Sequence, residues 1–256
     1  MIFETHAHYE EAAFDEDRRE LLESFPRHNI EYVVNISSGI KTVEQSISIA
    51  ENYEYIYSSA GIHPEDSSLM NEERLSWLKE KANHPKVVAV GEIGLDYYWD
   101  TLGRNTQKTW FVRQIEMAKE INKPLVIHSR DAANDTLNIL KDSNASEVGG
   151  VLHCFGYGVE QARQYLNMGF YLGIGGVVTF KNGRKLKEVV AFSPLEQLVL
   201  ETDCPYLSPV PYRGKRNSSL YLPYIAQEIA NIKSIDYDTV IRVTNENAKR
   251  LYKMKG

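Results

Sequence analysis

The sequence has few cysteines and no long apolar run, and both absences limit what the protein can be. Only two of its 256 residues are cysteine, Cys154 and Cys204, which is too few for a fold held together by disulfides. No apolar stretch approaches the roughly 18 residues needed to cross a bilayer. The first residues also lack the basic and then apolar layout of a signal peptide. We therefore expect a cytoplasmic protein with no membrane segment.

Linkers rich in Pro, Gly or Ser, low-complexity segments and internal repeats are also absent. A domain boundary has no obvious place, so we expect one domain over residues 1–256. Hydrophobic residues make up 43% of the chain and charged residues 25%, which is typical of a globular protein with a sizeable core. The formal net charge of −6 excludes a protein that coats nucleic acid through bulk positive charge, but not an enzyme with a local basic patch.

Short runs rich in β-branched and aromatic residues alternate with longer stretches of helical periodicity. Eight such runs predict strands, at 2–5, 32–36, 55–60, 87–92, 125–128, 150–155, 171–176 and 198–203. Helical stretches include 106–121, then 218–232, where Pro223 must lie in the first turn or kink the helix, and 236–254, which reads as one helix or two. Eight strand–helix units in about 250 residues predict a (β/α)8 TIM barrel. A doubly wound open sheet is the rival that periodicity alone does not exclude.

Histidines and acidic residues stand at the same end of five of these runs. They are His6, His8, Glu92, His128, His153 and Asp203. Because side chains alternate along a strand, His6 and His8 are expected on the same side. In a barrel all six would converge on the C-terminal mouth, where barrel active sites lie. Imidazoles and carboxylates together suit divalent cations, so a metal site is favoured over a chance set of polar strand ends.

Eight segments resemble the motifs of the TatD family of metal-dependent deoxyribonucleases. They are THAH (5–8), GIHP (61–64), GEIGLDYY (91–98), HSRDA (128–132), HCF (153–155), ETDCPYL (201–207), RGKRN (213–217) and NENAKRLY (245–252). They occur in the family's order and span nearly the whole chain. The resemblance implies a TIM barrel of the amidohydrolase type with two divalent ions. The histidines of THAH and Asp203 would hold one ion, and Glu92 would bridge to a second held by His128 and His153.

The resemblance also implies contacts to substrate. His63 would contact a substrate phosphate, although by its position after the third run it could also reach the mouth without binding anything. Arg213, Lys215 and Arg216 would contact phosphate as well. Packed cations such as these repel one another unless an anion binds between them, which favours a binding role for the RGKRN loop.

Three departures from the family pattern stand out. Glu4 replaces the usual Asp before the first motif, and its longer carboxylate could still orient a ligand histidine from behind. Tyr9-Glu10 replaces Leu-Asp or Leu-Asn after that motif. Ser218-Ser219 replaces Glu-Pro after RGKRN. None is a presumed ligand, and the last two could alter substrate preference.

Two further groups of side chains carry expectations. Tyr97, Tyr98 and Trp99 follow Glu92 closely and would either stack on a base or pack the barrel rim. By strand alternation, Cys154 and Cys204 should face the helix layer as buried thiols. Their strands are too far apart for a disulfide.

The function expected from these residues is hydrolysis of DNA phosphodiesters, as an exo- or endonuclease, through a metal-activated water. Asp203 would take the proton of that water, and Glu92 would serve as the bridging carboxylate. The ions could be Mg²⁺, Mn²⁺, Zn²⁺ or Co²⁺. Two alternatives stay open: a two-metal esterase such as a D-aminoacyl-tRNA deacylase, and a non-enzymatic metal-binding barrel. The oligomeric state is taken as monomer by default.

Overall fold

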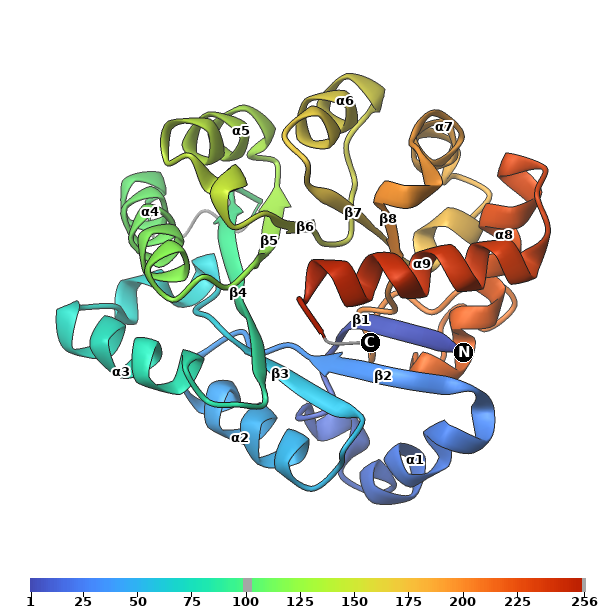
Figure 1. The fold of residues 1–256 in the computed structure, drawn as a ribbon, viewed down its shortest axis with the longest axis horizontal. Coiled ribbons are helices and arrows are strands. Elements are labelled where there is room, and N and C mark those ends of the chain that lie inside the picture. The colour runs from blue at the N-terminus through green and yellow to red at the C-terminus, as the bar shows by residue number, and fades with distance from the viewer. Residues whose placement is uncertain (99–102, 255–256) are drawn as a thin grey trace.

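Eight parallel strands form one sheet in chain order, with helices on the outside (Figure 1). The computed structural model describes residues 1–98 and 103–254. The strands are β1 (Ile2–Ala7), β2 (Ile30–Asn35), β3 (Ile56–Ala60), β4 (Val87–Asp96), β5 (Leu125–Arg130), β6 (Gly150–Leu152), β7 (Tyr171–Ile174) and β8 (Leu198–Leu200). The order β1 to β8 confirms the predicted TIM barrel, because a doubly wound sheet has a strand order that does not follow the chain.

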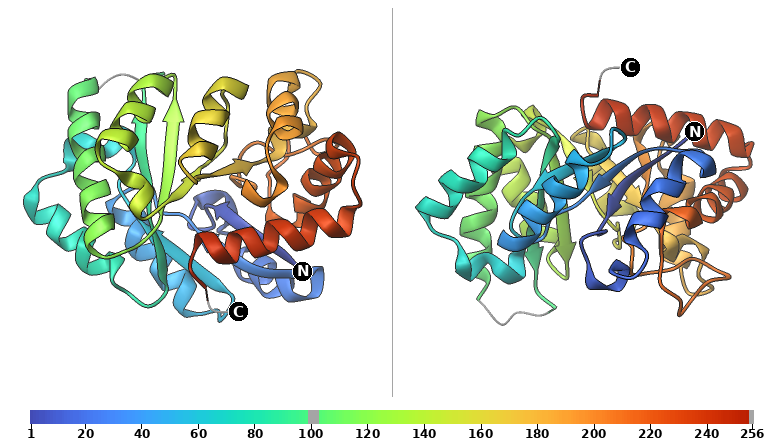
Figure 2. Two further views of the ribbon diagram at one scale, coloured as in Figure 1. Left: turned by 45° about the horizontal axis from the view of Figure 1, so that its top comes forward. Right: turned by 90° about the horizontal axis from the view of Figure 1, so that it is seen from below.

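The helices follow the strands in alternation and surround them from every side shown in Figure 2. They are α1 (Arg18–Ser24), α2 (Ile40–Glu51), α3 (Glu72–Ala82), α4 (Arg104–Glu120), α5 (Ala133–Asp142), α6 (Val159–Asn167), α7 (Arg184–Phe192), α8 (Leu222–Lys233) and α9 (Tyr237–Leu251). Pro223 lies in the first turn of α8, where its missing N–H costs no helical hydrogen bond. The closing stretch forms one helix, not two. Within the described residues, no helix is long and apolar enough to span a membrane.

The N-terminal end of the barrel is closed by α9, which lies beside the start of β1 in Figure 1. Tyr252, just after α9, stacks on Phe3 with ring centroids 5.9 Å apart. Its hydroxyl donates to the Thr5 carbonyl at 2.7 Å. The Asn247 side chain donates to the Leu198 carbonyl at 2.7 Å. The NENAKRLY segment therefore fills one end of the barrel and leaves the opposite end for a site.

At the other end, the ring closes between β1 and the segment after β8. The Asp203 N–H donates to the His6 carbonyl at 2.9 Å, and the His8 N–H donates to the Cys204 carbonyl at 2.9 Å. These bonds continue the pairing beyond the last residue of β8. They place Asp203 directly beside the two histidines of the first strand.

Candidate metal centre

The six predicted ligands lie together at the C-terminal mouth of the barrel. His6, Glu92 and His128 lie within β1, β4 and β5, and His8, His153 and Asp203 follow β1, β6 and β8. Each of the six is buried or half-buried. Local strand chemistry contributes to the placement, since β-branched and apolar residues extend the strands toward this end of the barrel, where the polar residues lie. The mouth is thus lined by charged and imidazole groups withdrawn from solvent.

Glu92 stands at the centre of this cluster. Its Oε2 lies 3.5 Å from His6 Nε2 and 3.9 Å from His8 Nε2. Its Oε1 lies 2.9 Å from His128 Nδ1 and 3.2 Å from His153 Nε2. The two oxygens of one carboxylate therefore face two different pairs of imidazoles, as a carboxylate that bridges two cations must.

Asp203 completes the group around the first pair. Its Oδ1 lies 3.7 Å from His6 Nε2 and 3.4 Å from His8 Nε2, and the two Nε2 atoms are 3.1 Å apart. One ligand atom from each of the three residues lies within 4.8 Å of the others. Both histidines point to the same side of β1, as strand alternation predicted.

Hydrogen bonds at the far nitrogens determine which ring atoms present lone pairs to the cluster. His8 Nδ1 lies 2.9 Å from the Ile36 carbonyl, which can only accept, so in the neutral ring Nδ1 carries the proton and Nε2 keeps its lone pair. His128 Nε2 lies 2.8 Å from the carboxylate of Asp96, so in the neutral ring Nδ1 keeps the lone pair and faces Glu92. Such partners orient metal-binding histidines in proteins.

Two carboxylates behind the histidines were missed in the sequence, Asp96 and Glu201. Glu201 Oε1 lies 3.4 Å from His153 Nδ1 and accepts the Cys154 N–H at 2.6 Å, while Glu201 Oε2 is buried with no hydrogen bond among the described residues. Glu201 also groups with His6 and His153 as a potential ligand. A signal existed for Asp96, which follows Glu92 by four residues, the even spacing of one face of β4. Glu201 lies beyond the last residue of β8, so strand alternation does not place it.

His63 reaches the cluster with an N–H in place of a lone pair. Its Nδ1 accepts the Glu65 N–H at 3.3 Å, so a neutral ring carries its proton on Nε2, which lies 3.9 Å from Glu92 Oε1. Burial, and then the charge of His128, lower the pKa of His63 to about 3. Although the ring is near enough to Glu92 and His128 to count as a potential ligand, this tautomer presents an N–H donor.

The carboxylates of the cluster are held in the ionised form. Burial opposes ionisation of Glu92, but the charge of His153 and hydrogen bonds from the imidazoles outweigh it and keep its pKa well below the ordinary value. Burial opposes ionisation of Asp203 as well, but the hydrogen bond with His8 and the positive charges of the surrounding histidines together outweigh it and lower the pKa of Asp203. Burial also opposes the charged form of His153, but Glu92 and Glu201 raise its pKa well above the ordinary value.

The negative charge of these buried carboxylates must be balanced by positive charge, which protons on the imidazoles or divalent cations can supply. A set of imidazole nitrogens and carboxylate oxygens suits Zn²⁺, Mn²⁺ or Co²⁺, and Mg²⁺ less well. The lone pairs directed inward and the central position of Glu92 add to this chemistry. The residues present therefore fit two divalent ions.

A cavity of about 360 Å³ opens beside the cluster. Its lining consists of His128, Ser129, Arg130, Asp131, His153, Cys154, Gly156, Tyr157, Asp203 and Leu207. Asp203 is the carboxylate of the ligand cluster that also lines this cavity. It therefore contacts the histidines and is accessible to a substrate in the cavity. Arg130 brings a cation to the same cavity and has no ion pair in the described part of the chain.

The expectation for Cys154 was wrong. Strand β6 ends at Leu152 and Cys154 has a φ of 44°, so strand alternation no longer applies and the half-buried residue lines the cavity. Cys204, in contrast, is fully buried in an apolar cluster with Tyr9 and Phe14, as expected. Both thiols are free, which confirms that they form no disulfide.

The three cations of the RGKRN loop have different surroundings. Arg216 forms a two-pronged ion pair with Asp17, at 2.7 and 2.5 Å, so its charge is already neutralised. The Arg213 guanidinium lies 3.8 Å from the centre of the Phe180 ring, and Lys215 Nζ lies 5.8 Å from that of Tyr212. Within residues 1–98 and 103–254, neither Arg213 nor Lys215 has a carboxylate partner.

The aromatic residues after Glu92 divide between the two expected roles. Tyr97 packs against the core and donates its hydroxyl to Asp135 at 2.6 Å, so it belongs to the rim. Tyr98 is 54% exposed, and the Arg130 guanidinium lies 3.8 Å from its ring centre. Trp99 lies outside the described residues.

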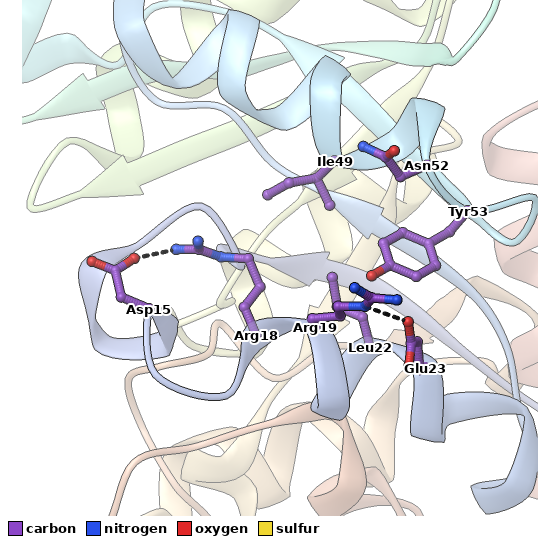
Figure 3. Close-up of a pocket in the computed structure, with 8 residues that line it drawn as sticks. All are labelled: Asp15, Arg18, Arg19, Leu22, Glu23, Ile49, Asn52 and Tyr53. Atoms are coloured by element: carbon purple, nitrogen blue, oxygen red, sulfur yellow. Dashed lines mark hydrogen bonds and ion pairs between the residues drawn. The ribbon is translucent and has the colours of Figure 1, made fainter.

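A larger hollow of about 590 Å³ lies away from the metal cluster, between α1 and α2 (Figure 3). Its charged side chains pair with one another, Arg18 with Asp15 at 2.6 Å and Arg19 with Glu23 at 2.8 Å. None of the six cluster residues lines it. The smaller cavity at the mouth is therefore the one that matters for chemistry.

Comparison with known proteins gives relatives over nearly the full chain. A family model described as TatD related DNase matches residues 3–253. A Bacillus subtilis (strain 168) protein named "Uncharacterized metal-dependent hydrolase YabD" is 45% identical, over 99% of this chain and 100% of that protein. A Rahnella sp. (strain Y9602) protein named "3'-5' ssDNA/RNA exonuclease TatD" is 30% identical, over 100% and 99%. The crystal structure of YjjV, a TatD homologue from Escherichia coli K12, matches with a TM-score of 0.93 and 25% identity, over 99% and 98%.

Proposed function

Because this chain belongs to the TatD-related DNase family of metal-dependent hydrolases, we propose that it hydrolyses phosphodiester bonds of single-stranded DNA. The observation that carries the proposal is the central position of Glu92, whose two oxygens face separate imidazole pairs. A site for two cations, beside a cavity whose arginine has no ion pair among the described residues, suits a phosphodiester, which carries negative charge on the group to be cleaved. The printed name of the Rahnella relative supports a nucleic-acid strand as substrate.

The ligands divide into two sets around Glu92. The two histidines of the first strand and Asp203 would hold one ion, and His128 and His153 would hold the other. When bound, such ions lower the pKa of a water molecule and neutralise charge on the phosphate oxygens. Asp96 and Glu201 would orient the second pair of histidines from behind.

The remaining steps fall to Asp203 and Arg130, which line the cavity, and to His63, which lies beside Glu92. A carboxylate oxygen of Asp203 takes the proton of the attacking water, since Asp203 is ionised and lines the cavity. The Nε2–H of His63 donates to an oxygen of the phosphate, for which its neutral tautomer is suited. The guanidinium of Arg130 binds another phosphate oxygen from the side of β5.

The test is hydrolysis of single-stranded DNA labelled at the 3′ or the 5′ end. Protein stripped with a chelator is assayed before and after addition of Mg²⁺, Mn²⁺, Zn²⁺ or Co²⁺. We expect cleavage that metal restores and that His128→Ala lacks, and the ladder from each labelled end gives exo- or endonuclease action and direction. His28→Ala is the matched control, because His28 is exposed and lies just before β2, at the end of the barrel opposite to the ligands.

Absence of cleavage with every metal, despite two ions bound per chain, would contradict the proposal. In that case release of free amino acid from aminoacyl-tRNA tests the esterase alternative with the same variants. Metal binding with no hydrolysis of either substrate would leave a non-enzymatic barrel.

A further inference from the structure

A second cavity lies next to the mouth, between the segments that follow β7 and β8. Its volume is about 450 Å³, and it is lined by Lys181, Asn182, Val210, Pro211 and Arg213. None of these residues is one of the six predicted metal ligands. The cavity therefore does not serve the bond that is cleaved, and its composition points to another part of a substrate.

The chain connects this cavity to the one beside the metal cluster. Leu207 lines the first cavity and Val210 the second. Three residues of extended chain span at most about 11 Å. A ligand that leaves the first cavity along this segment therefore reaches the second within a short distance.

The walls of the second cavity are fixed by contacts with η5 (Gly176–Thr179). The Val210 N–H donates to the Thr179 hydroxyl at 2.9 Å. The Leu207 carbonyl lies so close to Gly176 that a Cβ there would meet it at 2.1 Å. Arg213 is held over the Phe180 ring at 3.8 Å. The cavity thus belongs to an ordered part of the surface and not to a loose loop.

The lining combines unpaired cations with an apolar edge. Lys181 and Arg213 have no carboxylate partner among the described residues, whereas nearby Arg184 pairs with Glu188 and Arg216 with Asp17. Val210 is 44% exposed, and the exposed Pro211 continues this edge. A nucleotide has the matching features, a phosphate for the cations and a flat base for the apolar edge.

We propose that this cavity binds the nucleotide that neighbours the scissile one in a single DNA strand. The proposal rests on the proposed function and adds a direction to it, because the strand leaves the metal cluster across the β7–β8 side of the mouth. Through contacts made away from the cleaved bond, the cavity then makes the protein prefer DNA strands to small phosphate esters.

The experiment compares two substrates in the double variant Lys181→Gln/Arg213→Gln. One is a five-residue oligodeoxynucleotide, which reaches both cavities. The other is thymidine 5′-(4-nitrophenyl) phosphate, which has one nucleotide and reaches only the first. We expect the ratio of kcat/KM for the oligonucleotide to kcat/KM for the ester to fall several-fold. The slope of log kcat/KM against log salt for the oligonucleotide should also become shallower by about 0.7, the value for the one phosphate that the protein no longer neutralises.

The control Arg27→Gln/Lys141→Gln removes the same charge from segments that precede β2 and β6, at the opposite end of the barrel. It should leave both the ratio and the slope as in the wild type. A double variant at the second cavity with wild-type ratio and slope would overturn the subsite and leave the proposed function standing. An equal loss on both substrates would overturn it too, since a general defect does not depend on strand length. If the wild type cleaves the ester but no oligonucleotide, the proposed function fails and the subsite with it.

Discussion

The hydroxyl groups of Tyr9 and Ser219 lie 2.7 Å apart and join segments 210 residues apart in the chain. The Tyr9 hydroxyl also accepts the Ser219 N–H at 2.9 Å. The Ser219 hydroxyl lies 2.9 Å from the carboxylate of Glu4, to which it donates. These residues are the departures from the TatD pattern that the sequence showed at three separate places. Their contact makes them one unit beneath the metal centre.

Glu4 acts on the backbone of a ligand histidine and not on its imidazole. Its carboxylate accepts the His6 N–H at 3.1 Å and the Thr202 N–H at 2.9 Å, and it accepts the Thr202 hydroxyl at 2.7 Å. Glu4 therefore holds a ligand histidine through its backbone N–H. Glu4 also ties β1 to the residue before Asp203.

The Tyr9 and Ser219 hydroxyls should be energetically coupled. Tyr9→Phe leaves the Ser219 N–H without its acceptor, and Ser219→Ala leaves the proton of the Tyr9 hydroxyl without its acceptor, so each should lower the free energy of unfolding by about 1–3 kcal/mol. The double variant should lose less than the sum, by at least about 0.5 kcal/mol. Urea unfolding of the wild type, both single variants and the double variant measures this. Additive losses would show that the two hydroxyls act independently.

The stability of the protein should depend on pH through Glu4. Burial, only partly offset by hydrogen bonds from Thr202, His6 and Ser219, raises the pKa of Glu4 from 4.5 to about 8. Between these values the folded protein keeps a proton that the unfolded chain has lost, so this stabilisation falls as pH rises through the window. Glu4→Gln cannot titrate, and its stability relative to the wild type should rise from pH 4.5 to 8. Unfolding measured at several pH values checks the sign, and a constant difference would contradict it.

Asp203 should matter for the reaction more than for the fold. Asp203→Asn keeps the shape of the side chain but cannot take a proton, so hydrolysis should fall by about 10²–10⁴-fold. Asp131→Asn is the matched control, because Asp131 lines the same cavity without joining the ligand cluster. Turnover of DNA is measured together with thermal unfolding. Near wild-type turnover in Asp203→Asn would remove it from the proton transfer.

The two carboxylates behind the histidines should control metal affinity. Glu201→Gln and Asp96→Asn remove the negative charge that faces His153 and His128. Each change should lower metal affinity or activity by about 10–100-fold. Competition with a chromogenic chelator measures the affinity. Glu196→Gln, an exposed change just before β8, should have no effect. Wild-type affinity in both buried variants would show that neither carboxylate orients a ligand.

The sequence by itself determined the eight strands and the polar residues that lie at or near their carboxyl ends. Local periodicity suffices for this, because a run of β-branched residues extends the chain and alternation fixes the side of each residue. The pair His6 and His8 follows directly from that rule. Parallel strands in a barrel bring their carboxyl ends together, so the fold class was enough to predict the cluster around Glu92.

Only the tertiary structure decided how the surrounding residues act. Cys154 leaves strand geometry through a positive φ, which no alternation rule describes. The pairing of Arg216 with Asp17, and of Tyr9 with Ser219, joins residues roughly 200 positions apart. Their contacts depend on how the segments after β1 and β8 pack at the mouth. Hydrogen bonds of this range have no local signal in the chain, because each partner's environment exists only once the barrel has closed.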